Sequence, residues 1–167
     1  ATAPIILYNV PGRTGCKISP DVVRRLSVHP NVMAIKEASG DIGYAMKVAR
    51  YLSDDFTMYS GNDDITIPLM SLGALGVISV ASNIVPGAVA KLCALCLEGS
   101  YAEATELYAK YASLFSALFI ETNPIPVKAA MKMMGMDSGI LRLPLTEISQ
   151  ESFETLLKAM RDAGINV

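Results

Sequence analysis

The chain has 167 residues, 51% of them hydrophobic, with a formal net charge of −2 and a pI near 5.4. This length can bury the core of one domain, and the mild acidity argues against a nucleic-acid-binding surface. No apolar run approaches the ~20 residues that a membrane span requires, so we expect neither a nucleic-acid nor a membrane partner.

Four short apolar segments predict β-strands over residues 4–8, 32–36, 56–60 and 76–80. Helices are predicted between and after them, over residues 20–27, 41–52, 64–73 and 86–99. Strand and helix therefore alternate with short connections, which favours right-handed βαβ units and a parallel sheet. The repeat of about 25 residues is close to the βα unit of an eightfold barrel.

The remaining sequence predicts three helices, over residues 100–121, 124–135 and a segment ending at Gly164. The predicted fold class is α/β. Residues 1–99 form four βα units, half of a (β/α)8 barrel, and residues 100–167 form a C-terminal helical domain. Since such a barrel requires eight strands, we expect the sequence to be the C-terminal half of a larger protein.

The cysteines, Cys16, Cys93 and Cys96, are sparse and odd in number, which favours a reducing compartment and a cytoplasmic location. Cys93 and Cys96 match C-x-x-C, but they lie within a predicted helix rather than at its start, where a thiolate would be stabilised. We therefore expect them to pack as small apolar side chains. The only histidine, His29, has no ligand neighbours at metal-site spacing, so no metal is expected.

Lys36 closes the second predicted strand and is followed by a turn containing Gly40 and Asp41. In a parallel barrel the C-terminal edge of the strands carries the active site. An amine at that edge can attack a carbonyl group to form a Schiff base. On spacing alone, a solvated surface lysine is the more common case.

Polar groups also follow the other predicted strands. Tyr8 and Asn9 end the first, Gly61-Asn62-Asp63 follows the third, and Ser79 lies near the end of the fourth. Arg13 comes shortly after the first strand, and arginine is suited to bidentate binding of a carboxylate. Taken singly, Tyr8 also fits a strand-end aromatic and Arg13 a loop charge.

Four segments together resemble one family. In order they are Tyr8–Gly15, Ile35–Asp41, Ser60–Asp64 and Asn123–Lys128. They are similar to the dihydrodipicolinate synthase branch of the pyruvate-dependent aldolases, in the N-acetylneuraminate lyase superfamily, and the resemblance covers essentially the whole chain. It implies an eightfold barrel with a C-terminal helical domain, usually a homotetramer. It also implies condensation of pyruvate with L-aspartate 4-semialdehyde to 4-hydroxy-tetrahydrodipicolinate, without a cofactor, in diaminopimelate and lysine biosynthesis.

The resemblance also implies roles for single residues. Lys36 would form an imine with pyruvate, Tyr8 would relay protons, and Arg13 would bind the carboxylate of the semialdehyde. Gly61 and Asn62 would contribute to the substrate pocket, and the backbone carbonyl of Ile78 would lie near the lysine. Lyase members of the family usually lack an arginine where Arg13 stands, which favours the synthase over sialic acid cleavage.

Part of the family's proton relay has no counterpart in this sequence. A Thr-Thr pair and a second tyrosine belong to the family's N-terminal half, which is therefore an expected partner. Three readings stay open: half of a working synthase, a catalytically incomplete half-barrel that self-associates, or another pyruvate-dependent aldolase. Arg13-Thr14-Gly15 speaks against the third.

Overall fold

A computed structural model describes residues 2–167, which divide into two compact units. The first comprises the chain up to Ser79 together with Cys93–Tyr101, and it contains the β-sheet. The second comprises Val80–Leu92 and Ala102–Val167, and it is helical.

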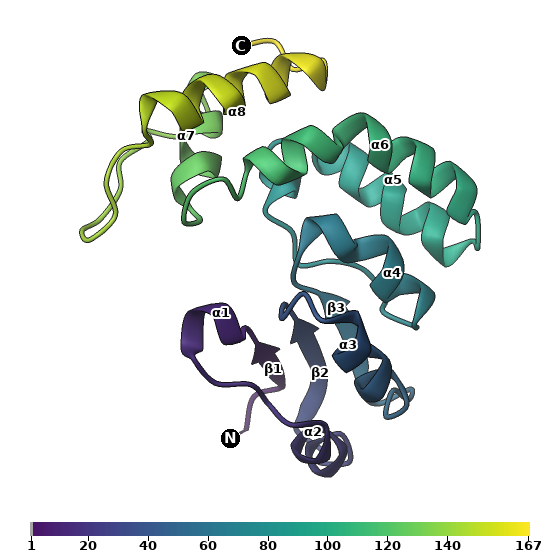
Figure 1. Cartoon of the computed structure of the whole chain (residues 1–167). Coiled ribbons are helices and arrows are strands. Elements are labelled where there is room, and N and C mark those ends of the chain that lie inside the picture. Colours follow the sequence, from purple (N-terminus) through teal and green to yellow (C-terminus); the bar gives the residue numbers. More distant parts are fainter. Residues whose placement is uncertain (1) are drawn as a thin grey trace. The chain divides into compact units, whose positions relative to one another are not determined.

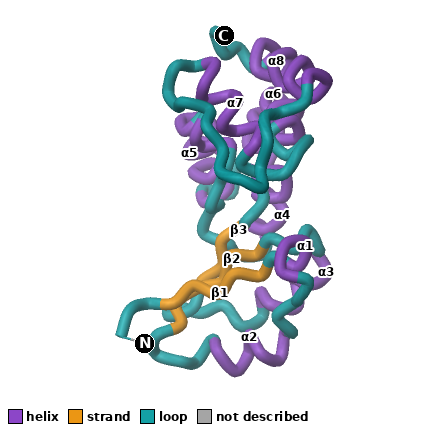
Figure 2. Tube along the Cα trace, turned by 90° about the vertical axis from the view of Figure 1, so that its left-hand side faces the viewer, coloured by secondary structure: helices purple, strands orange, loops and turns teal. Residues whose placement is uncertain are grey.

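The sheet consists of β1 (Ile5–Asn9), β2 (Val32–Glu37) and β3 (Thr57–Ser60), all parallel and in the order β1-β2-β3. Figure 2 shows the three strands side by side. Three of the predicted strands and their parallel arrangement are therefore confirmed, with their ends shifted by one residue.

The predicted strand over residues 76–80 is wrong as a strand. Val77 forms only an isolated parallel bridge with Ser60, through hydrogen bonds from Ser60 N to Gly76 O and from Ile78 N to Ser60 O, both 2.8 Å long. The pairing stops there because β3 itself ends at Ser60 and the chain enters a 3-10 turn, η2 (Ala81–Asn83). The segment lies beside β3 and runs parallel to it, but its ladder is too short to be a strand.

The sheet unit contains the helices α1 (Pro11–Thr14), α2 (Pro20–Leu26), α3 (Ile42–Ala49) and α4 (Thr66–Ser71), which are labelled in Figure 1. The 3-10 turn η1 (Asp63–Ile65) leads into α4. α2 and α3 begin where expected, because the Ser19 side chain accepts from Val22 N and that of Asp41 from Tyr44 N. The short helix α1 was not predicted. It begins at Pro11 and ends at Thr14, and it is followed by Gly15, whose φ of 65° is left-handed.

One face of the sheet is covered and the other is open. Ile35 and Met58, which are paired on the covered face, are fully buried, as are Val23 of α2 and Val48 of α3. On the opposite face Ile6 is 50% exposed. A hollow of about 860 Å³ lies over this open face. It is lined by Ile6, Ala34, Thr57, Tyr59 and residues of the loops that lead into the three strands.

The helical unit contains α7 (Ile125–Met133), α8 (Gln150–Asp162) and most of α6 (Tyr101–Ala117). α5 (Pro86–Leu97) contributes residues to both units. The predicted helices after residue 86 are thus confirmed, with shorter ends. The residues of the helical unit that are 0% exposed are all apolar: Ala81, Ala104, Leu114, Leu118, Ala130, Leu156 and Met160.

Cys93 is half-buried and Cys96 is buried, and desolvation raises the pKa of both thiols above the ordinary value. Such thiols stay protonated and pack as apolar groups. Over residues 2–167 no cluster of three His, Cys, Asp or Glu side chains is arranged to hold a metal ion. In that same range no helix combines the length and apolar character that crossing a membrane requires.

Candidate active site

Tyr8, Lys36 and Tyr59 form a row across the C-terminal edge of the sheet. Lys36 is the register partner of Tyr8 on β1 and of Tyr59 on β3. Paired residues of parallel strands project from the same face, so the three side chains share the open face of the sheet. The Nζ atom of Lys36 lies 4.4 Å from the centroid of the Tyr8 ring. The amine of Lys36 therefore lies over the face of the Tyr8 ring at this edge.

Gly61 lies against the stem of the lysine. A Cβ atom added at Gly61 would lie 3.1 Å from Lys36 Cε and only 2.5 Å from Ala38 Cβ. The backbone N of Gly61 donates to Glu37 O at 2.7 Å, which holds the turn after β3 against the end of β2. The missing side chain is therefore what lets this turn and the lysine approach so closely.

We expect Gly61→Ala to impair the site and to destabilise the fold. The new methyl group would meet Ala38 Cβ, which cannot rotate away, so the backbone at the ends of β2 and β3 must move. Overpacking of this kind typically costs about 1–3 kcal/mol. Urea unfolding measures the stability, and the yield of an adduct between the Lys36 amine and an added carbonyl compound measures the integrity of the site. Gly87→Ala is the matched control, because nothing lies within 4 Å of its added Cβ. Equal behaviour of the two variants would contradict the packing role of Gly61.

The next row of the register, Asn9, Glu37 and Ser60, lies on the covered face and is almost fully buried, with exposures of 0%, 1% and 0%. Asn9 Nδ2 donates to Glu37 Oε2 at 2.7 Å. The other carboxylate oxygen, Oε1, accepts from Ser39 N at 2.7 Å and from Ser39 Oγ. A buried polar network thus lies directly behind the Tyr8–Lys36 pair.

Tyr59 and Glu37 were not predicted as site residues, and Asn9 was expected only as a polar group at the end of its strand. A signal was present, because strand side chains alternate between faces. Tyr59 lies two positions before Gly61, so its side chain points to the same face of the sheet as that site residue. Asn9 directly follows Tyr8 and Glu37 directly follows Lys36, so these two side chains must point to the opposite face. A carboxylate on a covered face requires hydrogen-bond partners.

The segment from Val10 to Ile18, which carries Arg13, is held in place at its C-terminal end. Tyr44 Oη donates to Ile18 O at 2.7 Å, and Lys17 Nζ donates to Asp41 Oδ2 at 2.7 Å while lying 4.6 Å from the Tyr44 ring centroid. Burial raises the pKa of the Tyr44 phenol well above its usual value. The hydrogen bonds from Lys17 and from the Tyr44 backbone lower the pKa of the Asp41 carboxyl. Arg13 itself lies on α1 and is exposed.

Asn62 and Ile78 lie at the same edge, on the turns that follow β3 and the Val77 bridge. Ile78 N donates to Ser60 O, which places Ile78 beside the residue that precedes Gly61. Asn62 O accepts from Ser60 Oγ at 2.7 Å, so the backbone of this turn is fixed as well. Of the sequence-predicted residues, the structure brings Tyr8, Lys36 and Gly61 together most closely.

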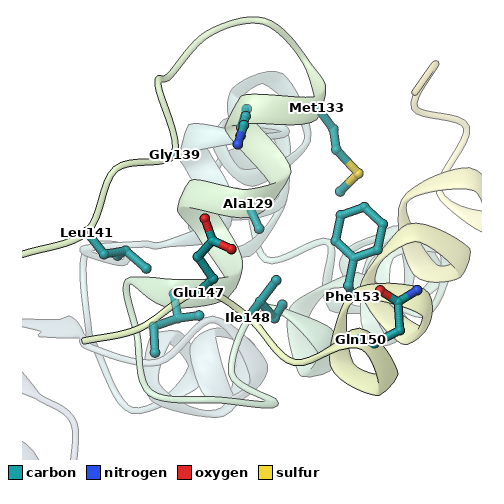
Figure 3. Close-up of a pocket in the computed structure, with 10 residues that line it drawn as sticks. Ala129, Met133, Gly139, Leu141, Glu147, Ile148, Gln150 and Phe153 are labelled. Carbon is teal, nitrogen blue, oxygen red and sulfur yellow. The ribbon is translucent and has the colours of Figure 1, made fainter. Parts of the chain in front are cut away.

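The helical unit holds a second hollow, of about 510 Å³, that contains none of these residues. Figure 3 shows Met133 and Phe153 together on one side of it and Leu141 on the other. Its charged lining groups are Lys132 and Glu147, both exposed. The strand edge with its amine and phenol is therefore the stronger candidate for chemistry.

Comparison with known proteins finds similarity over almost the whole chain. Residues 1–163 match the profile of the dihydrodipicolinate synthetase family. The chain belongs to this family. It is 46% identical, over 158 residues, to a 4-hydroxy-tetrahydrodipicolinate synthase of Methanospirillum hungatei, covering 94% of this chain and 54% of that protein. The chain spans about half the length of the curated family members it matches.

Solved structures of the family are similar in fold. Dihydrodipicolinate synthase from Aquifex aeolicus aligns with a TM-score of 0.95 and 41% identity, over 99% of this chain and 57% of that one. The enzyme from Acinetobacter baumannii, solved as a complex with pyruvate, aligns with a TM-score of 0.93 and 44% identity, over 99% of this chain and 57% of that one. The α/β fold is therefore that of the family.

Proposed function

We propose that this chain carries the Schiff-base lysine of a 4-hydroxy-tetrahydrodipicolinate synthase, which condenses pyruvate with L-aspartate 4-semialdehyde. The observation that carries the proposal is the Lys36 amine at the C-terminal edge of a parallel sheet, 4.4 Å from the Tyr8 ring centroid. The pyruvate complex of the similar Acinetobacter baumannii enzyme supports pyruvate as the first substrate.

The chemistry requires an amine and a proton carrier. The Lys36 amine attacks the carbonyl carbon of pyruvate, and the carbonyl oxygen leaves as water, giving an iminium. The iminium withdraws electrons, so the methyl group loses a proton and becomes an enamine carbon. That carbon forms a bond to the aldehyde carbon of the second substrate, whose oxygen takes a proton. The amino group of the second substrate then attacks the iminium carbon and displaces the Lys36 amine, which closes the ring of the product and frees the lysine. The lysine supplies the electron sink that a cofactor would otherwise provide.

Each remaining site residue has a proposed role in this reaction. Tyr8 carries protons to and from the nitrogen and oxygen that change bonding, because its ring contacts the amine. Arg13 binds the carboxylate of the semialdehyde from α1. Gly61 admits the lysine stem, and Asn62 with the Ile78 carbonyl completes the wall of the pyruvate pocket.

We further propose that residues 1–99 are four βα units of a (β/α)8 barrel and that residues 100–167 are its C-terminal helical domain. The parallel order β1-β2-β3, continued by the Val77 bridge, supports this arrangement. The full-length protein would then add an N-terminal half of comparable size, as in the relatives that this chain half covers. It would act in the cytoplasm, in diaminopimelate and lysine biosynthesis, as a homotetramer.

A steady-state assay of the full-length protein tests this function. We expect condensation of pyruvate with L-aspartate 4-semialdehyde and no cleavage of N-acetylneuraminate, because Arg13 offers a carboxylate-binding group that suits the semialdehyde. Cleavage of the sugar acid without condensation would overturn the proposal.

Arg13→Ala is expected to raise the KM for the semialdehyde and to leave that for pyruvate nearly unchanged. Losing one charge-assisted hydrogen bond costs roughly 1.5–3 kcal/mol, or about ten- to a hundredfold in affinity. Initial rates with each substrate varied in turn give the two constants. Arg25→Ala, which removes an exposed arginine of α2, is the control. Equal increases in both constants would contradict the role given to Arg13.

A further inference from the structure

The Asn9 side chain joins three segments of the sheet unit. It is 0% exposed, and both of its polar atoms are used. Nδ2 donates to Glu37 Oε2 at 2.7 Å, across to β2, and Oδ1 accepts from Ile18 N at 3.1 Å, in the loop before α2. Asn9 itself ends β1, directly after Tyr8.

The bond to Glu37 fixes how the ends of β1 and β2 lie relative to each other. Asn9 and Glu37 are register partners, and Ala38 N also donates to Asn9 O at 2.9 Å. Because neighbouring strand residues point to opposite faces, this buried pair lies behind Tyr8 and Lys36. Ser39 holds the second oxygen of Glu37, so the carboxylate cannot turn away from Asn9.

The bond to Ile18 closes the segment that carries Arg13. That segment leaves the sheet at Asn9 and returns to the Asn9 side chain nine residues later. Tyr44 Oη holds the other backbone polar atom of the same residue by donating to Ile18 O. Within the segment, α1 is closed by Gly15 N donating to Pro11 O at 2.9 Å. The Asn9 amide is thus one of the anchors that hold the segment carrying Arg13, and it is the one that joins this segment to the end of β1.

We propose that Asn9 is a positioning residue that couples the two substrate sites. Through Glu37 it aligns the phenol and the amine that act on pyruvate, and through Ile18 it fixes the arginine segment that receives the semialdehyde. This role rests on the proposed function of the site. A buried amide side chain suits this role because its NH₂ group donates and its oxygen accepts, and because it carries no charge.

The test exchanges the Asn9 amide and the Glu37 carboxylate in the full-length protein, first singly and then together. Asn9→Asp places a carboxylate oxygen against Glu37 Oε2, and Glu37→Gln leaves an NH₂ group facing either Asn9 or Ser39. The double variant Asn9→Asp/Glu37→Gln restores every hydrogen bond with the polarity of one bond reversed, and it keeps the net charge. We expect each single variant to slow pyruvate trapping on Lys36 and to raise the semialdehyde KM about ten- to a hundredfold. The double variant should recover most of both losses.

Tyr44→Phe is the contrast, because it loosens only the Ile18 anchor. It should raise the semialdehyde KM and leave pyruvate trapping unchanged. Thermal melts show which variants are folded. A folded double variant as impaired as its worse single variant would overturn the coupling, as would an Asn9→Asp protein with wild-type constants. If wild-type protein traps no pyruvate, the proposed function fails instead. Hydrogen exchange at the Ile18 amide then still tests the anchor, since Asn9→Ala should speed it if the anchor exists.

Discussion

Borohydride reduction in the presence of pyruvate is expected to leave one pyruvate-derived adduct on the full-length protein, and none on the Lys36→Ala variant. Only an imine between the carbonyl group and an amine is reduced to a stable adduct, and Lys36 places an amine at the sheet edge beside Tyr8. Loss of the amine removes the electron sink, so condensation should fall to background. Intact-mass measurement and peptide mapping give the stoichiometry and the site.

Two further variants test whether the adduct requires the amine of Lys36 itself, and not merely a positive charge at this site or any lysine of the chain. Lys36→Arg keeps a cation at the site but offers no imine-forming nitrogen, so it should also lack the adduct. Lys47→Ala removes an exposed lysine of α3 and should trap pyruvate as the wild type does. An undiminished adduct on Lys36→Ala would show that another residue forms the imine.

The elements that were predicted correctly are those in which one local signal decides the structure. Ser19 and Asp41 were expected to cap helices, and both accept the predicted type of backbone hydrogen bond. The apolar run before Lys36 was expected to be a strand, and β2 covers it. Local propensity and tertiary burial agree at these positions, which is why the sequence alone was sufficient.

The parts that were missed depend on pairing between distant segments. The predicted strand over residues 76–80 has a suitable apolar run, but strand length is decided by the neighbour, and β3 ends at Ser60, so the pairing does not continue past Ile78. The short helix α1 has no apolar periodicity to reveal it. The hydrogen bond between Asn9 and Glu37 joins residues 28 positions apart, so no local sequence pattern predicts it.

The candidate site was predictable in its residue types but not in its geometry. The resemblance supplied Tyr8, Lys36, Arg13, Gly61, Asn62 and Ile78. The structure adds that Gly61 is required by the close approach of Lys36 Cε, and that the buried row behind the site holds the two strand ends in register. Such facts depend on distances between side chains, which the sequence does not contain.

The open face of the sheet has a consequence for the isolated chain of 167 residues. We expect it to have at most trace condensation activity, and we expect an added N-terminal half to raise that activity about 10²- to 10⁴-fold. This range is the typical contribution of one positioned acid or base, and the Thr-Thr pair and second tyrosine of the family's relay would come from the added half. The exposed side of Ile6 and the hollow beside it offer the surface against which that half would pack. Mixing the purified halves and following condensation gives the measurement.

The same mixing experiment with Lys36→Ala in this chain is its control, because the added half should restore nothing without the amine. Size-exclusion chromatography should show the two halves eluting together, since packing would cover the open sheet face and its unpaired edge. The isolated chain, by contrast, should self-associate through that face. Near-normal turnover by the 167-residue chain alone would mean that Tyr8 and Lys36 are sufficient, and that hydroxyl partners from another segment are not required for proton transfer.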